Sequence, residues 1–102
     1  KRNFIILGIQ SKIIRINLEN NVIDTLVDFS IIPFFEFLEN DSYLIAIFEM
    51  GISVISKDGE LKWKLELPEI LIDWEIVDEN IKLSYFDGKI GIHSLQIGEL
   101  LS

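Results

Sequence analysis

Carboxylates are the side chains of this sequence whose number and spacing could do chemistry. Thirteen of the 17 acidic residues fall in two stretches, 16–56 and 65–81, that contain no Lys or Arg. Positioned carboxylates can serve in glycoside hydrolysis, bind cations or attract a positively charged partner. Because the acids are segregated from the bases, the chain carries a local negative field in addition to its formal net charge of −8.

The spacing of these residues argues against a catalytic or metal site. The turns Glu39-Asn40-Asp41 and Asp78-Glu79-Asn80 lack the Asp-x-Asp-x-Asp-Gly register of a calcium loop. His93 is the only histidine and cysteine is absent, so the usual zinc sites are excluded. The six glycines are scattered singly and form no phosphate loop. We therefore expect a non-enzymatic protein with no catalytic residue, metal or cofactor, and a structural or surface role for His93.

Composition sets the broad class. A chain of 102 residues with 49% hydrophobic and 25% charged residues can form one globular domain with a single core. Pro33 and Glu36 interrupt the apolar run of 29–35 far below the length of a membrane span, so we expect no membrane partner. The acidic balance repels nucleic acid. The absence of cysteine is compatible with a reducing compartment, and we expect the protein to be cytoplasmic.

Short runs rich in Ile, Val, Phe and Trp alternate with turn residues and predict an all-β fold. We expect an antiparallel meander of about eight to eleven strands, arranged as a half-propeller or a twisted β-sandwich. The ten candidate strands are Asn3–Leu7, Lys12–Leu18, Val22–Val27, Phe34–Leu38, Tyr43–Phe48, Ile52–Ser56, Leu61–Leu67, Ile70–Val77, Ile81–Phe86 and Ile90–Leu95.

A repeat of 38 to 39 residues underlies these strands and predicts units at about 1–28, 29–67 and 68–102 of one domain. The segment 56–61 matches 94–100, and each follows two strands. In the first unit Asn20 occupies the place of Gly59, where we expect a positive φ.

The segments Gly51–Leu65 and Tyr85–His93 resemble the outer hairpins of β-propeller blades of the quinoprotein or WD type. This resemblance implies nearly three blades, whereas a closed propeller needs about four or more. Three interpretations follow: a free-standing half-propeller or sandwich, a piece of a larger propeller, or a dimer that completes a ring. We expect the first, because the last unit ends in a short candidate strand at Glu99–Ser102.

Alternation along 69–77 predicts where the acids point. The even positions Ile70, Ile72, Trp74 and Ile76 should face the core, and the odd positions, which include Leu71, Asp73 and Glu75, should face solvent. Trp63 should lie in the core with Leu61 and Leu65, which share its parity. The repeat places a second acidic strand and turn at 34–41. The expected partner-binding residues are Asp73, Glu75, Asp78, Glu79, Glu36, Glu39 and Asp41.

Such a surface suits a basic protein, although solubility explains acidic residues as well. In size and acidity the chain resembles the immunity proteins of bacterial contact-dependent inhibition systems. That resemblance implies a cognate toxin domain, commonly a cationic nuclease, whose active site the protein would block as a monomer in a 1:1 heterocomplex rather than as a homo-oligomer. The alternative is a propeller-type interaction scaffold or a fragment of a larger propeller.

Overall fold

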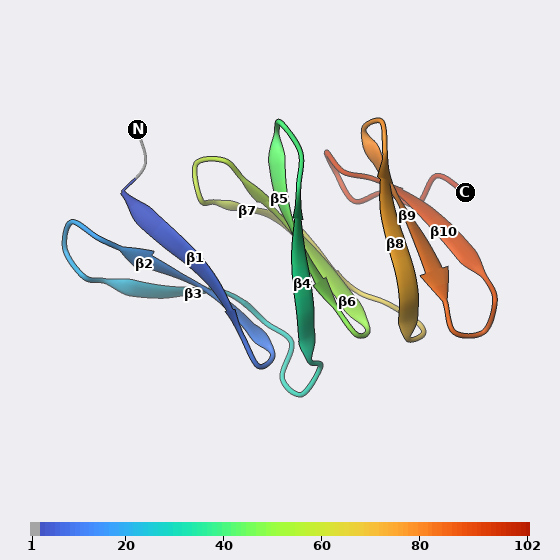
Figure 1. Cartoon of the computed structure of the whole chain (residues 1–102), viewed down its shortest axis with the longest axis horizontal. Coiled ribbons are helices and arrows are strands. Elements are labelled where there is room, and N and C mark those ends of the chain that lie inside the picture. Colours follow the sequence, from blue (N-terminus) through green and yellow to red (C-terminus); the bar gives the residue numbers. More distant parts are fainter. Residues whose placement is uncertain (1–2) are drawn as a thin grey trace.

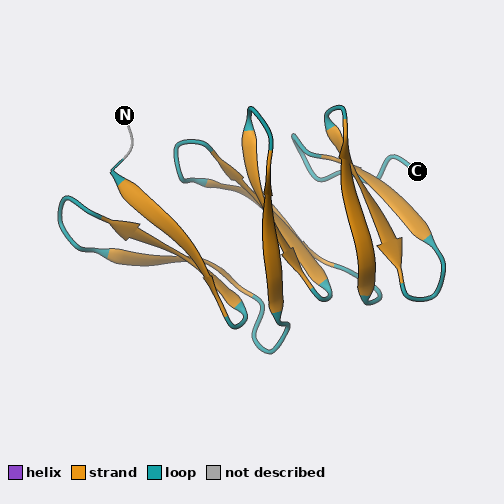
Figure 2. Ribbon diagram, viewed as in Figure 1, coloured by secondary structure: helices purple, strands orange, loops and turns teal. Residues whose placement is uncertain are grey.

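A computed structural model describes residues 3–102, which form ten antiparallel strands and no helix (Figures 1 and 2). The ten strands predicted between residues 3 and 95 are present with ends within two residues of the expected positions, so the all-β prediction is confirmed. The short strand expected at Glu99–Ser102 is absent, and Leu100 forms only an isolated bridge with His93. No helix among residues 3–102 is long and apolar enough to cross a membrane. The strands are β1 (Phe4–Ile9), β2 (Lys12–Asn17), β3 (Ile23–Asp28), β4 (Phe34–Glu39), β5 (Tyr43–Phe48), β6 (Gly51–Ser56), β7 (Leu61–Glu66), β8 (Leu71–Val77), β9 (Asn80–Tyr85) and β10 (Ile90–Ser94).

The strands form three sheets that lie in a row (Figure 1). We call them the N-terminal blade (β1–β2–β3), the central blade (β4–β5–β6–β7) and the C-terminal blade (β8–β9–β10). Each sheet lies within one of the three predicted repeat units. The row measures 45 × 29 × 17 Å. Because the three sheets follow one another in a line, only the central blade of the described chain has a neighbouring sheet on both faces.

Tight turns join successive strands, as the Asp- and Asn-rich segments predict. Gly88 has φ +88° in the β9–β10 turn, where a side chain would be strained. The β8–β9 turn places Asp78 at φ +57°. The positive φ expected at Asn20 falls instead on Asn21, at +60°, because this turn is one residue longer: the Asn21 N–H donates to the Asn17 carbonyl, whereas the Gly59 N–H donates to the Ser56 carbonyl.

β-Bulges overturn two of the alternation predictions. In β8, Leu71 pairs with Tyr85 while Asp73 pairs with Ser84, so Ile72 is an extra residue between two paired positions. Leu71 is consequently buried at 3% exposure and Ile72 is exposed at 58%, the reverse of the prediction. From Asp73 onward the expected alternation holds.

A bulge in the β6–β7 pairing has the same effect on Trp63. Val54 pairs with Trp63 while Ile55 pairs with Leu61, so Lys62 is the extra residue. Trp63 packs against the core toward the C-terminal blade, and Leu61 packs against the core toward the N-terminal blade. The prediction that the two share a face is therefore wrong, although both do contact buried residues.

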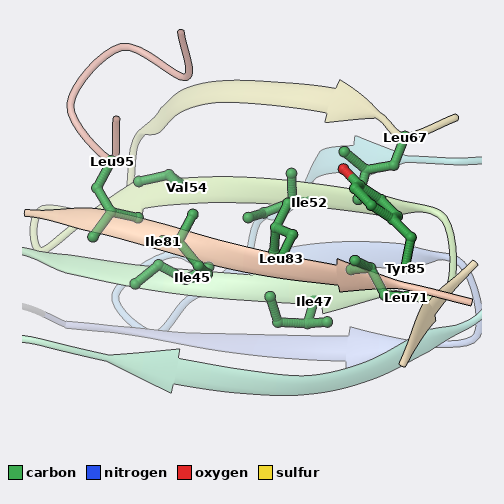
Figure 3. Close-up of a cluster of buried hydrophobic side chains, with 10 residues drawn as sticks. All are labelled: Ile45, Ile47, Ile52, Val54, Leu67, Leu71, Ile81, Leu83, Tyr85 and Leu95. Carbon is green, nitrogen blue, oxygen red and sulfur yellow. The ribbon is translucent and has the colours of Figure 1, made fainter. Parts of the chain in front are cut away.

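Two hydrophobic clusters hold the row together, one at each interface between blades. The cluster between the central and C-terminal blades is shown in Figure 3, where β5, β6 and β9 supply most of the side chains. The other cluster joins the N-terminal and central blades through Ile13, Val27, Phe29, Ala46, Phe48 and Ile55. At each interface both sheets present an apolar face, and the two faces bury each other to form a hydrophobic core.

Candidate functional site

β8 is the edge strand that carries the predicted acidic pair. Trp74 and Ile76 pack against the core on the side of the central blade. The alternating residues Asp73 and Glu75 therefore project from the opposite, outward face of the C-terminal blade, and both are exposed. The structure confirms the expected orientation of these two carboxylates.

A lysine that sequence reasoning did not place lies on the same outward face. Lys82 of β9 stands directly across the ladder from Glu75, and Ser84 stands across from Asp73. Opposite charges at such cross-strand positions attract by about 0.2–1 kcal/mol. The Glu75 charge is thus partly compensated by Lys82. The alternation of residues in β9, together with its hairpin pairing to β8, was the sequence signal that could have predicted the position of Lys82.

Two acidic turns extend this surface along one long side of the row (Figure 1). The register of β8–β9 repeats that of β4–β5, since Leu71↔Tyr85 corresponds to Phe34↔Phe48. Figure 1 shows the β4–β5 and β8–β9 turns on this side of the molecule. Asp41 in the first turn and Asp78 and Glu79 in the second are exposed. We call Asp41, Asp73, Glu75, Asp78 and Glu79 the acidic end.

The two remaining predicted residues have partners within the protein. Glu36 accepts a 2.6 Å hydrogen bond from Nε1 of Trp74, so it links β4 to β8. Glu39 forms a 2.7 Å ion pair with Lys57. Both stay exposed, but their charges are engaged. Their contribution to a partner interface is therefore smaller than that of the acidic end.

An aromatic pair lies beside Glu36. The rings of Phe35 and Trp74 stack at a centroid distance of 5.8 Å and an interplanar angle of 26°. Phe35 is exposed and Trp74 is half-buried, so the pair offers apolar area next to carboxylates. Aromatic residues in such a setting are typical anchors of protein interfaces. Trp74 packs against the core as predicted. Its indole N–H, however, lies at the surface and donates to Glu36.

Arg15 pairs with one acid of the first base-free stretch and with Glu60, which lies outside it. Its guanidinium contacts Asp24 at 2.8 Å, Glu60 at 3.2 Å and the carbonyl oxygen of Gly59 at 2.8 Å. The hydrogen bond to Asp24 is the main cause that raises the pKa of Arg15, partly offset by burial. This cluster joins the N-terminal blade to the β6–β7 turn.

A separate cavity of about 720 Å³ lies between the end of β7 and the β9–β10 hairpin. Tyr85, Asp87, Lys89 and His93 line it together with apolar side chains. His93 is buried, and its Nδ1 lies 3.1 Å from the carbonyl oxygen of Gly98. A carbonyl only accepts, so Nδ1 donates in this contact and the ring braces the 94–98 turn. The structural role expected for His93 fits this position.

Tyr85 gives the cavity a measurable pH response. Burial, with the Asp87 carboxylate as the smaller cause, raises the pKa of Tyr85 above its ordinary value of 10.0. Folding therefore favours the neutral phenol, and this stabilisation is complete below about pH 10 and is lost as the pH rises through the folded-state pKa. We expect the free energy of unfolding to fall in that alkaline window, with Tyr85 ionising late by ultraviolet absorbance. In Tyr85→Phe this part of the alkaline loss should vanish; an unchanged profile would contradict the prediction.

Within residues 3–102 no group of three or more His, Cys, Asp or Glu side chains is arranged to hold a metal ion. No protein-family model and no curated protein matches the sequence. Solved structures do match it.

The chain is similar to the AfRom2 CNH domain, with a TM-score of 0.60, 12% identity, and coverage of 100% of this chain and 37% of that one. It is similar to the N-terminal domain of Nup159, with a TM-score of 0.59, 12% identity, and coverage of 97% and 27%. A europium-containing methanol dehydrogenase matches with a TM-score of 0.59, 9% identity, and coverage of 97% and 22%. The chain thus spans 22% to 37% of the length of these propeller-like proteins. The likeness concerns the fold, and this chain has a propeller-like arrangement of three blades.

Proposed function

We propose that the protein is a non-enzymatic binding module whose acidic end engages a basic protein. The observation that carries the proposal is the exposure of five carboxylates, on the outward face of β8 and in the β4–β5 and β8–β9 turns, which lie on the same long side of the row in Figure 1. Carboxylates so placed would steer a cationic partner into encounter, and the effect would weaken with salt. The Phe35–Trp74 pair, on the other face of β8 from Asp73 and Glu75, would supply an apolar contact that slows dissociation if the partner also reaches the β4 and β8 edges.

In its narrower form, the proposal assigns the partner to the cationic nuclease toxins and the protein to their immunity proteins. Its support is the acidity, the small size and the charge that a nuclease groove, built for phosphates, would attract. Each chain would block one partner, in the cytoplasm of the producing cell. The propeller-like neighbours favour a second candidate, a propeller-type interaction scaffold without an inhibitory role.

A pair of charge-reversed variants tests the acidic end. Asp73→Lys with Glu79→Lys reverses two of the five charges of the acidic end. Glu66→Lys with Glu69→Lys makes the same change of net charge near the opposite end of β8. In pull-downs from the source cell, the native protein and the control pair should recover the same basic protein, and the first pair should not. With the purified partner, the first pair should lower the association rate by about tenfold or more at low salt and flatten its salt dependence.

Three results would count against the proposal. Recovery of no basic protein removes the acidic-module function, and equal binding by both pairs moves the interface away from the acidic end. If the recovered protein has nuclease activity that one equivalent of the native protein does not inhibit, the immunity role fails and the scaffold role remains.

A further inference from the structure

The outward face of the N-terminal blade is an exposed apolar sheet surface. Ile5, Leu7 and Ile9 alternate with the inward-facing residues of β1 and are 44%, 39% and 45% exposed. Their cross-strand neighbours on β2 and β3 extend the same face, because Ile5 pairs with Ile16 and Ile16 pairs with Ile23. We call this the N-terminal apolar face; its residues are Ile5, Leu7, Ile9, Ile14, Ile16 and Ile23.

The corresponding surface of the central blade is fully buried. The register of β1–β2 repeats that of β5–β6 with a shift of 39 residues, so Leu7 and Ile9 correspond to Ala46 and Phe48. Ala46 and Phe48 have no exposed area, because they lie in the cluster that joins the central blade to the N-terminal blade. The N-terminal apolar face is therefore built like a surface that another sheet covers.

The other end of the row does not complement this face. By the shared register of β4–β5 and β8–β9, the positions of the buried residues Ile45 and Ile47 are taken in the C-terminal blade by Lys82 and Ser84. Asp73 and Glu75 stand beside them. A head-to-tail contact between copies would bury these charges against isoleucine and leucine, which is strongly unfavourable. The β8–β9 part of this outward face is therefore charged, as in a capping repeat, while Ile90 and Ile92 of β10 lie on the same face beside Ser84 and Lys82.

We propose that the N-terminal apolar face binds the same face of a second copy of this chain about a two-fold axis. An isologous contact of this kind closes after two copies, which fits a row with one apolar end and one end that carries charges. Lys12 and Asp28 face each other across the ladder at the rim, so each copy brings both signs of charge to the contact. The acidic ends stay at the far ends of the dimer, where their repulsion is small.

The size of the face sets the strength of the dimer. Three strands about 4.8 Å apart, each six residues of about 3.4 Å, give a footprint of roughly 300 Å² per copy. A standard interface buries about 800 Å² per partner, so the dimer is expected to be weak and to dissociate on dilution. This proposal differs from the monomer expected from the sequence and is independent of the proposed function.

Sedimentation velocity across the micromolar range tests the dimer. Leu7→Lys with Ile23→Lys places like charges on the face without touching the buried clusters, and Ile72→Lys with Val77→Lys does the same to exposed residues of the C-terminal blade. We expect the native protein and the control pair to dimerise with concentration, and the first pair to remain monomeric with an unchanged circular dichroism spectrum. If the lysine pair unfolds, Ile5→Thr with Ile9→Thr keeps the β-branched character of the strand and should also weaken the dimer.

The proposal is overturned by a native protein that stays monomeric, by a dimer that survives both sets of face variants, or by a ladder of larger oligomers. A monomer that binds an apolar dye through this face, with binding lost in the Leu7→Lys and Ile23→Lys pair, would show instead that the face is open to a different sheet.

Discussion

Replacing Phe48 by Ala is expected to lower the free energy of unfolding by about 3–5 kcal/mol, the largest effect of any single truncation discussed for this protein. Phe48 has no exposed area. Its ring meets Phe29 edge-to-face at 4.7 Å and Phe34 at 5.5 Å. The substitution would lose the buried area, both aromatic contacts and the packing between the first two blades. The free energy of unfolding of a small domain is only about 5–15 kcal/mol. Chemical denaturation should therefore show a large fall in the denaturant concentration at the midpoint of unfolding.

Phe86→Ala is the matched control, because it makes the same chemical change at a side chain that is 72% exposed. It should alter the free energy of unfolding by about 0.5 kcal/mol or less. Similar losses for the two variants would mean that the cluster around Phe48 does not join the blades as described.

Gly8→Ala is expected to be the second most damaging change, at about 1–3 kcal/mol. A Cβ on Gly8 would overlap the Phe34 ring, most closely at Cε2. The Phe34 ring has little freedom to move, because it also packs against Phe37 at 4.8 Å and Phe48 at 5.5 Å. The added methyl group would therefore push β1 away from β4 and loosen the interface between the N-terminal and central blades.

Two comparisons isolate this effect. Gly91→Ala adds the same methyl group in β10, where the nearest neighbours would lie at an ordinary 3.5 Å, and it should be close to neutral. In a Phe34→Leu background, Gly8→Ala should cost clearly less, which a double-mutant cycle by denaturation measures. An unchanged cost in that background would show that the Phe34 ring is not the obstacle.

Local sequence signals were sufficient for the strands. β-Branched and aromatic runs separated by Asp, Asn and Gly turns each carry their own physical cause, so all ten strands and their antiparallel order could be predicted. The repeat likewise predicted that the 34–41 and 71–79 segments are equivalent, which the sheet registers confirm.

The bulges were not predictable from alternation. A bulge adds one residue to one strand of a pair, and the sequence of that strand alone does not say where the partner skips a position. For this reason the predicted burial of Leu71 and Ile72 was reversed, and Leu61 and Trp63 lie on opposite faces of their sheet. Alternation predicted Asp73 and Glu75 correctly because it applies again once the bulge has passed.

The sequence by itself determined the strands, the segregation of the acids and the candidate residues of the acidic end, because these depend on residue type and on neighbours along the chain. Only the tertiary structure decided which charges are compensated. Lys57 meets Glu39 and Trp74 meets Glu36 across longer separations in sequence, and the register of the β8–β9 hairpin places Lys82 across from Glu75. Packing likewise decided which faces of the first and last blades stay uncovered, and so which of the apolar and charged residues of these strands are exposed.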